Sequence, residues 1–295
     1  MNTPIRYAFF GTGTLAESVL ASLVRNGYIP SLIVTKPDSL QGRHMELTSP
    51  HIKTWADMKG IPVCQPISLR EIGPDSPLIS STFDLFIVAS YGKIIPEEIL
   101  NLPGHGVLNV HPSLLPEYRG PSPIESALLD GHSTLGISIM KLDKEMDHGP
   151  ILVQTAFPID REATAGTLEV TGGQMGGDLL VQVIPPYIGG VLIPKEQDHS
   201  KATVCKKIEK AQGEIKLSDS AESVRRKFRA LMPWPGLYFF IEHGGKQLRV
   251  KITKINVELV LAEDAIAEEV ITLVIPEGKK EMDWESFKRG YMSHH

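Results

Sequence analysis

The sequence has few cysteines and no long hydrophobic run, and each shortage excludes a class of protein. Its 295 residues include two cysteines, Cys64 and Cys205, which lie far apart and follow no metal-ligand spacing. A disulfide-stapled domain and a cysteine-ligated metal centre are therefore not predicted, and we expect reduced thiols and no bound metal. A membrane-spanning helix needs about 20 apolar residues. The hydrophobic runs here are much shorter, so no membrane contact is predicted.

A signal peptide and an activated nucleophile are missing as well. Residues Met1–Arg6 lead directly into an apolar stretch, without the segments of a secretion signal. We therefore expect a cytoplasmic protein, and we expect it to be a monomer. No Ser or Cys occupies the strand-to-helix elbow that activates a nucleophile, so covalent acyl-enzyme chemistry is not predicted.

Charge is unevenly distributed along the chain, whose net charge is −5. Residues 1–199 carry 13 Lys and Arg against 21 Asp and Glu, a net charge of −8. Residues 200–256 carry 13 basic and 5 acidic residues, a net charge of +8, and residues 257–295 return to −5 with 4 basic and 9 acidic residues. A basic block within an acidic protein favours a polyanion partner such as nucleic acid, whereas a solvated helix face is the alternative interpretation.

Predicted strands and helices alternate in the first 90 residues. An apolar strand over residues 5–10 precedes the glycine turn Gly11–Ala16, a helix to about Arg25 and a second strand over residues 29–35. This strand–helix–strand unit predicts a parallel sheet, which the apolar run at 84–90 extends. The predicted fold class is therefore α/β, with a Rossmann-like, mostly parallel sheet in the N-terminal domain.

The glycine turn leaves a nucleotide-binding oxidoreductase open as an alternative. Its Gly-x-Gly-x-x-Ala pattern is compatible with a dinucleotide fingerprint, which also requires an acidic residue at the end of the second strand. Asp38 lies beyond that strand and after a proline, which weakens this interpretation. A tight strand-to-helix turn also explains the glycines without any nucleotide.

Two segments of the N-terminal region lack a simple periodic pattern. Residues 36–50 show no hydrophobic periodicity and predict a long functional loop, after which Ser49 as N-cap and Pro50 start a helix. Residues 163–184 predict a helix that Pro185 stops. The glycine run 172–177 inside that helix has no explanation from the sequence.

A change in composition near residue 190 marks a domain boundary. Two glycines and a proline open a polar stretch that we interpret as a linker over residues 190–205. After a helix over residues 220–231, short strands alternate with turns, which predicts a small β-barrel of the OB-like kind. We therefore predict an N-terminal α/β domain over residues 1–189 and a C-terminal β-barrel domain over residues 206–295.

The candidate site lies where an apolar strand, residues 106–111, enters a loop rich in Pro and Gly. Residues two apart share one face of a strand, so Asn109 and His111 project together from its C-terminal end, where open α/β sheets bind ligands. Asp147 follows another apolar run, in a turn. An ordinary polar loop contact and an ordinary turn residue are the alternative interpretations.

An amide, an imidazole and a carboxylate together suit direct attack of a bound nucleophile on a carbonyl group. Asn109 would donate a hydrogen bond to the developing oxyanion. His111 would stabilise that oxyanion or move a proton, and Asp147 would orient the imidazole and assist proton removal. The following loop is fixed by prolines and a glycine and could form a pocket wall; these residues are Pro112, Pro116, Gly120, Pro121 and Pro123.

The same stretch resembles the signature of the 10-formyltetrahydrofolate-dependent formyltransferases. The matching residues are Asn109, His111, Pro112, Ser113, Leu114, Leu115, Pro116, Tyr118, Arg119 and Gly120, followed by Gly136, Met140 and Met146–Gly149. The resemblance implies that Asn109, His111 and Asp147 are catalytic and that 10-formyltetrahydrofolate is the co-substrate. The residues it implies as folate contacts are Ser113, Leu114, Leu115, Pro116, Tyr91 and Gly92.

Other segments resemble the branch of this family that acts on methionyl-tRNA. They are the loop around Gly42–Arg43, the basic block, Pro233–Gly236 and a segment from Met282 to Gly290. The resemblance implies that Arg43, Lys206 and Lys207 contact the acceptor stem of initiator tRNA. It also implies a tRNA-binding C-terminal domain and N-formylmethionyl-tRNA, used in translation initiation, as the product. The family loop is often lysine-rich after the arginine, whereas His44–Glu46 follow here.

Three alternatives stay open from the sequence. A formyltransferase of the same family could use a sugar nucleotide or another small amine as acceptor, although a small acceptor does not need a basic second domain. The dinucleotide-dependent oxidoreductase is the second alternative. The third is an RNA-binding protein without catalytic activity, which the intact Asn, His and Asp disfavour.

Overall fold

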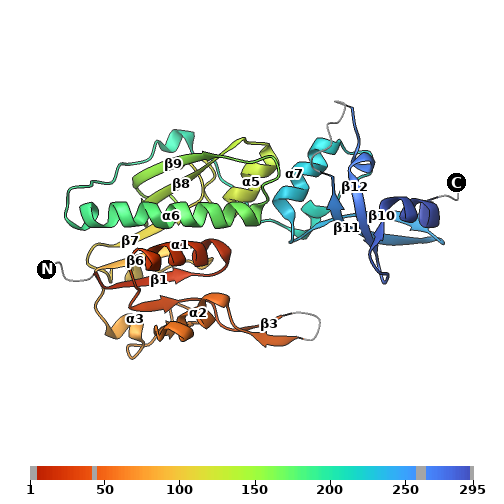
Figure 1. Ribbon diagram of the computed structural model, residues 1–295. Coiled ribbons are helices and arrows are strands. Elements are labelled where there is room, and N and C mark those ends of the chain that lie inside the picture. The colour runs from red at the N-terminus through yellow and green to blue at the C-terminus, as the bar shows by residue number, and fades with distance from the viewer. Residues whose placement is uncertain (1–4, 42–44, 257–263, 293–295) are drawn as a thin grey trace. The chain divides into compact units, whose positions relative to one another are not determined.

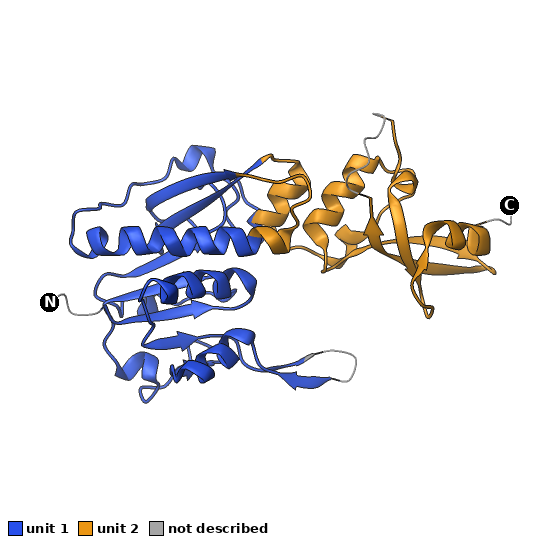
Figure 2. Cartoon of the chain, viewed as in Figure 1, with its two compact units in different colours: residues 1–123, 134–157, 169–205 blue, residues 124–133, 158–168, 206–295 orange. Residues whose placement is uncertain are grey.

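The computed structural model describes residues 5–41, 45–256 and 264–292 (Figure 1), and the chain divides into two compact units (Figure 2). Unit 1 comprises residues 1–123, 134–157 and 169–205, and unit 2 comprises residues 124–133, 158–168 and 206–295. The stretch predicted as a linker, residues 190–205, belongs to unit 1. Among the helices of the described ranges, none has both the length and the hydropathy that crossing a membrane requires.

A seven-stranded sheet with the order β5-β2-β1-β6-β7-β8-β9 lies at the centre of unit 1 (Figure 1). The pairs β1–β2, β1–β6, β2–β5 and β6–β7 are parallel, and β7–β8 is antiparallel. The strands are β1 (Tyr7–Gly11), β2 (Leu32–Val34), β5 (Val63–Cys64), β6 (Leu85–Ala89), β7 (Val107–His111), β8 (Thr134–Lys141) and β9 (Ile151–Pro158). The predicted α/β fold with a mostly parallel sheet is confirmed.

The first strand–helix–strand unit forms because glycine permits a close turn after β1. A Cβ atom added at Gly11 would lie 2.6 Å from Ala16 Cβ, and Gly13 has a φ of 83°, which favours glycine. Helix α1 (Thr14–Arg25) buries its apolar stripe against the sheet. The remaining short helices of this unit are α2 (His51–Lys59), α3 (Pro77–Ser80), α4 (Glu97–Leu100) and the 3₁₀ turn η1 (His199–Lys201).

The glycine run in helix α6 (Ala165–Ile188) lets this helix pack closely against helix α1 and strand β7. Added Cβ atoms at Gly173 and Gly177 would each lie 2.6 Å from a serine Cβ of α1, at Ser18 and Ser22. One added at Gly176 would lie 2.4 Å from Val110 Cγ1 of β7. Residues four apart share a helix face, so one glycine stripe faces α1 and the other faces the sheet.

Two local predictions differ from the structure. Helix α6 continues past Pro185 to Ile188, because prolines in the last turn remove few hydrogen bonds and the Gly189 amide still donates to the Pro185 carbonyl at 3.0 Å. Helix α2 has Pro50 as its N-cap, one residue after the predicted Ser49.

The predicted 36–50 loop contains a small hairpin, β3 (Ser39–Gln41) paired antiparallel with β4 (Glu46–Thr48). The hairpin projects away from the sheet (Figure 1), and its cross-strand pair Leu40 and Leu47 is exposed. Strands of three residues are too short to give a periodic pattern, which explains why the sequence predicted a loop. Gly42 and Arg43 lie outside the described residues.

Unit 2 contains a four-stranded antiparallel sheet with the order β10-β11-β12-β13. Its strands are β10 (Leu237–His243), β11 (Lys246–Ile255), β12 (Ile271–Pro276) and β13 (Met282–Asp283). Its helical segments are α5 (Pro123–Asp130), η2 (Lys210–Gly213), α7 (Ala221–Leu231), η3 (Ala267–Glu269), α8 (Trp284–Phe287) and the π-helical η4 (Lys288–Met292). Phe239, Trp284 and Phe287 pack together in its core. The predicted small β domain at the C-terminal end is confirmed as an antiparallel sheet.

Candidate active site

Asn109 and His111 lie on β7 and point away from helix α6. Val110, between them, faces Gly176 of α6, and alternate strand residues point to opposite faces. The two side chains therefore share the other face, as their spacing predicts. Both residues are nearly buried, with 8% and 4% of their surface exposed.

The imidazole of His111 lies between a loop carbonyl and the carboxylate of Asp147. Its Nε2 is 2.8 Å from the carbonyl oxygen of Tyr118, which can only accept, so Nε2 carries the hydrogen of this bond. Its Nδ1 is 3.7 Å from Oδ2 of Asp147. This separation is longer than a hydrogen bond, although catalytic contacts often tighten when a substrate binds.

Asp147 is held in an unusual backbone conformation. Its φ is 51°, in the left-handed region that costs a residue with a side chain about 1–2 kcal/mol. Its Oδ2 accepts a hydrogen bond from the Gly120 amide at 2.8 Å, so the signature loop contacts the carboxylate directly. Gly149 is also required, because an added Cβ would lie 2.0 Å from the Lys141 carbonyl oxygen.

The side chain of Asn109 forms no hydrogen bond within residues 5–41, 45–256 and 264–292, in contrast to its neighbour His111. Buried amides normally have partners, so a nearly buried one without a protein partner is available to a ligand. The structure therefore brings His111 and Asp147 together and leaves the Asn109 amide free to donate at the same end of β7.

The predicted folate-contacting loop is fixed by side-chain hydrogen bonds to its backbone. The Ser113 hydroxyl donates to the Glu117 carbonyl at 2.6 Å, and the Ser138 hydroxyl donates to the Ser113 carbonyl at 2.6 Å. Gln154 donates to the Leu115 carbonyl at 2.8 Å. Ser113 and Leu115 are buried, whereas Leu114 has 37% of its surface exposed. Leu114 is the member of this loop whose side chain can meet a ligand most directly.

Tyr91 and Gly92 follow β6. Tyr91 lies in the core with 2% of its surface exposed, and its ring packs edge-on against Phe10 with centroids 5.5 Å apart. Its hydroxyl has no partner among the described residues, and burial raises its pKa to about 12. Gly92 has a φ of 69°. The Lys36 Nζ lies 3.0 Å from where a Cβ of residue 92 would be.

A buried polar cluster that the sequence did not predict lies behind Asp147. Arg119 donates to Oε1 of Gln197 from Nε at 3.2 Å and Nη2 at 2.7 Å, and its Nη2 is 2.8 Å from His199 Nδ1. Gln197 donates to the carbonyls of Asp147 and Gly149, at 2.9 and 2.8 Å. Arg119 was part of the recognised signature without a role, and Gln197 lies in the predicted linker, where no pattern marked it.

A cavity of about 870 Å³ opens beside the turn that leads to Asp147. Its walls come from α4, the start of β7, the end of β8 and the following turn, and they include Leu100, Val107, Leu142, Asp143 and His148. The predicted folate contacts, Ser113–Pro116, Tyr91 and Gly92, are not among the lining residues. Cavities of this size commonly hold a cofactor or a drug-sized ligand.

Three residues were predicted to contact tRNA. Arg43 is outside the described residues, and Lys206 and Lys207 are exposed in unit 2. Over residues 5–41, 45–256 and 264–292, no group of three His, Cys, Asp or Glu side chains is arranged to hold a metal ion.

Comparison with known proteins identifies the class. Residues 5–184 match the family model for formyl transferases, and residues 207–268 match that for the formyl transferase C-terminal domain. The chain belongs to the formyl transferase family and is a formyltransferase.

The chain is similar to methionyl-tRNA formyltransferases. It is 42% identical to that of Chloroflexus aurantiacus over 246 residues, 83% of this chain and 79% of the relative. It is 35% identical to that of Thermus thermophilus, over 97% of this chain and 96% of the relative, and 34% identical to that of a Geobacillus species, over 98% and 96%.

Solved structures share the fold. HypX from Aquifex aeolicus superposes with a TM-score of 0.66 at 16% identity, covering 98% of this chain and 48% of HypX. A 4-N formyltransferase from Francisella tularensis gives a TM-score of 0.62 at 18% identity, covering 83% of this chain and 96% of that protein.

Proposed function

We propose that this formyltransferase moves the formyl group of 10-formyltetrahydrofolate to the free amino group of initiator methionyl-tRNA. The observation that carries the proposal is the His111–Asp147 pair beside the unpartnered Asn109 amide. The names of its relatives and their near-complete coverage support the acceptor. A solved complex of HypX with tetrahydrofolic acid supports the donor class.

The residues present fit a folate. The Asn109 amide, which has no protein partner among the described residues, supplies a hydrogen-bond donor, and the exposed Leu114 of the rigid Ser113–Pro116 loop supplies an apolar contact, as a heterocycle with hydrogen-bonding edges requires. The Ser113–Pro116 loop after β7, together with Tyr91 and Gly92 after the parallel strand β6, would hold the co-substrate. When bound, the folate supplies the formyl group, and the protein supplies the groups that position and polarise it.

Asn109, His111 and Asp147 would each have one role in the reaction. The Asn109 amide donates a hydrogen bond to the carbonyl oxygen under attack, where negative charge develops. As a cation, His111 would stabilise the same charge, while its Nε2–H donates to the Tyr118 carbonyl and fixes one edge of the ring. Asp147 orients the imidazole and assists removal of the proton from the attacking amine, directly or through a water.

Unit 2 supports a nucleic acid as acceptor. On one face of the β10–β11 pair, Tyr238 lies opposite Lys251 and Phe240 lies opposite Arg249. The Arg249 guanidinium is 3.9 Å from the centroid of the Tyr238 ring, and Phe240, Arg249 and Lys251 are exposed. Cations beside aromatic rings suit phosphates and bases.

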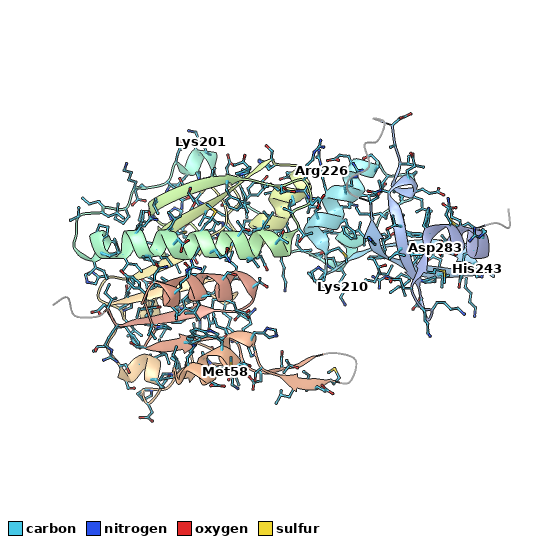
Figure 3. The ribbon with its side chains drawn as sticks, viewed as in Figure 1. Met58, Lys201, Lys210, Arg226, His243 and Asp283 are labelled. Atoms are coloured by element: carbon cyan, nitrogen blue, oxygen red, sulfur yellow. The ribbon has the colours of Figure 1, made fainter. Side chains whose placement is uncertain are left out.

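The basic stretch extends along unit 2, where Figure 3 labels Lys210 and Arg226 with their side chains drawn. We assign tRNA contact to residues 206–295, including Lys206 and Lys207, with Arg43 contributing from the 36–50 segment. We assign catalysis to residues 1–189 and a linker role to residues 190–205. Such an enzyme would act in the cytoplasm as a monomer.

The direct test is a formylation assay with 10-formyltetrahydrofolate and charged methionyl-tRNA, comparing initiator with elongator tRNA. We expect rapid formylation of the initiator and loss of most activity in His111→Ala, with the fold retained. A His111→Ala protein that formylates at the wild-type rate would contradict the catalytic assignment. Formylation of a sugar-nucleotide amine in preference to tRNA would establish the alternative acceptor.

A further inference from the structure

The polar cluster behind Asp147 connects this candidate catalytic residue to the segment before Lys206. Gln197 is buried, and its carboxamide is fully used: Oε1 accepts from Arg119, and Nε2 donates to two carbonyls of the Asp147 turn. The carboxamide therefore has one orientation, since its oxygen and nitrogen cannot exchange without losing both sets of bonds.

We propose that Gln197, held by Arg119, is the positioning residue that fixes Asp147 against His111. The inference rests on the proposed function, because it assumes that the Asp147 carboxylate assists the reaction. Left-handed backbone at a residue with a side chain persists only where its surroundings hold it. Here the two carbonyls bound by Gln197 flank the turn on one side, and the Gly120 amide binds the carboxylate on the other.

Arg119 holds the Gln197 carboxamide with two donors of one guanidinium. It is buried and forms no ion pair within the described ranges, and its side chain bonds the neutral Gln197 oxygen and His199 Nδ1. Accepting from Arg119 requires His199 Nδ1 to carry no hydrogen. The His199 ring in turn stacks on His148, with centroids 4.1 Å apart and planes 3° from parallel. His148 is the residue directly after Asp147, so the cluster returns to the turn that it supports.

The test uses Gln197→Glu, which keeps the shape of the side chain and strengthens its bond to Arg119 but cannot donate to the two carbonyls. We expect kcat to fall by about 10²-fold, as misplacement of a reacting group by about 1 Å does. KM for both substrates should change less than about threefold, because the binding surfaces stay in place. Gln174→Glu, the same charge change at an exposed position of α6, is the matched control and should keep full activity.

A double substitution separates positioning from general damage to the fold. In an Asp147→Asn background, Gln197→Glu should cost less than about twofold, because it acts through the carboxylate already removed. Arg119→Lys, which keeps the charge and loses the forked donor, should lower kcat with the same KM pattern.

The possible outcomes distinguish the positioning role of Gln197 from the proposed function. A normal rate for Gln197→Glu, or an equal loss in the Asp147→Asn background, overturns the positioning role and leaves the proposed function intact. A normal rate for Asp147→Asn alone overturns the assignment of Asp147, and the positioning role with it. Both proposals are supported if Gln197→Glu lowers kcat without changing the melting temperature and causes no further loss of kcat in the Asp147→Asn background.

Discussion

The turn around Asp147 and the outer face of β10 and β11 hold their functional side chains in opposite ways. At Asp147, the Gly120 backbone amide binds the carboxylate, and the buried Gln197 carboxamide binds two carbonyls of the turn, all at hydrogen-bond distance. On β10 and β11, Arg249 and Lys251 stand on exposed strand positions with few constraints. Acyl transfer depends on where single atoms lie, whereas polyanion binding depends on the density of charge. Single substitutions should therefore cause large, local losses in the first region and small, additive losses in the second.

The largest loss of activity should come from Asn109→Ala in the candidate active site. Removing one oxyanion donor should lower kcat by about 10²–10³-fold. Because the amide has no protein partner among the described residues, the melting temperature should change little. Single-turnover formylation and thermal melting measure the two effects. A loss below about fivefold would mean that Asn109 does not contact the reacting carbonyl.

In the second region, Lys206→Ala and Lys207→Ala should each weaken tRNA binding by a few-fold at most. Each lost phosphate contact should reduce the slope of log affinity against log salt concentration by about 1. Titrations at several salt concentrations measure the slope, and Lys59→Ala on α2 is a control outside the basic stretch. If one lysine costs as much as Asn109, or if the slope is unchanged, the proposed division between the two regions fails.

The smallest effect concerns Tyr91 of unit 1, whose hydroxyl has no hydrogen-bond partner among the described residues. Tyr91→Phe should raise the free energy of unfolding by about 1 kcal/mol at neutral pH, because a buried unpaired hydroxyl is unfavourable. Burial raises the pKa of Tyr91 from 10.0 to about 12, so ionisation of this group leaves stability unchanged below pH 10 and lowers it as pH rises from 10 through 12. The variant should lack this alkaline loss in denaturant titrations.

The same variant tests the folate contact. An unchanged KM for 10-formyltetrahydrofolate would mean that the Tyr91 hydroxyl only packs in the core. A KM raised about tenfold, without a change in stability, would mean that the hydroxyl binds the co-substrate.

The local pattern of apolar and polar residues was sufficient to predict the sheet and part of the candidate site. Strand alternation alone predicts that Asn109 and His111 share a face, because it needs no knowledge of the rest of the chain. Asp147 lies 36 residues after His111. Its proximity to His111 depends on the turn after β8, because β8 itself ends at Lys141 opposite Leu108, and no periodic pattern predicts such a turn.

Long-range partners could not be predicted. Gln197 lies among polar residues that resemble a linker, and its role depends on an arginine 78 residues earlier in the chain. The glycine run of α6 was unexplained for the same reason, since the surfaces that it meets belong to α1 and β7. The β3–β4 hairpin was missed because its strands are three residues long, too short for alternation to be detected.

Gly176 of α6 packs closely against Val110 of β7, the strand that carries the candidate catalytic residues Asn109 and His111. Val110 stands between Asn109 and His111 in the sequence and points to the opposite face of the sheet. The contact between Val110 and the α6 backbone therefore bears directly on the strand segment that carries both residues. Packed interiors transmit such displacements rather than absorb them. A single methyl group at position 176 would thus push on the strand that carries both candidate catalytic side chains without touching either, from the opposite face of the sheet.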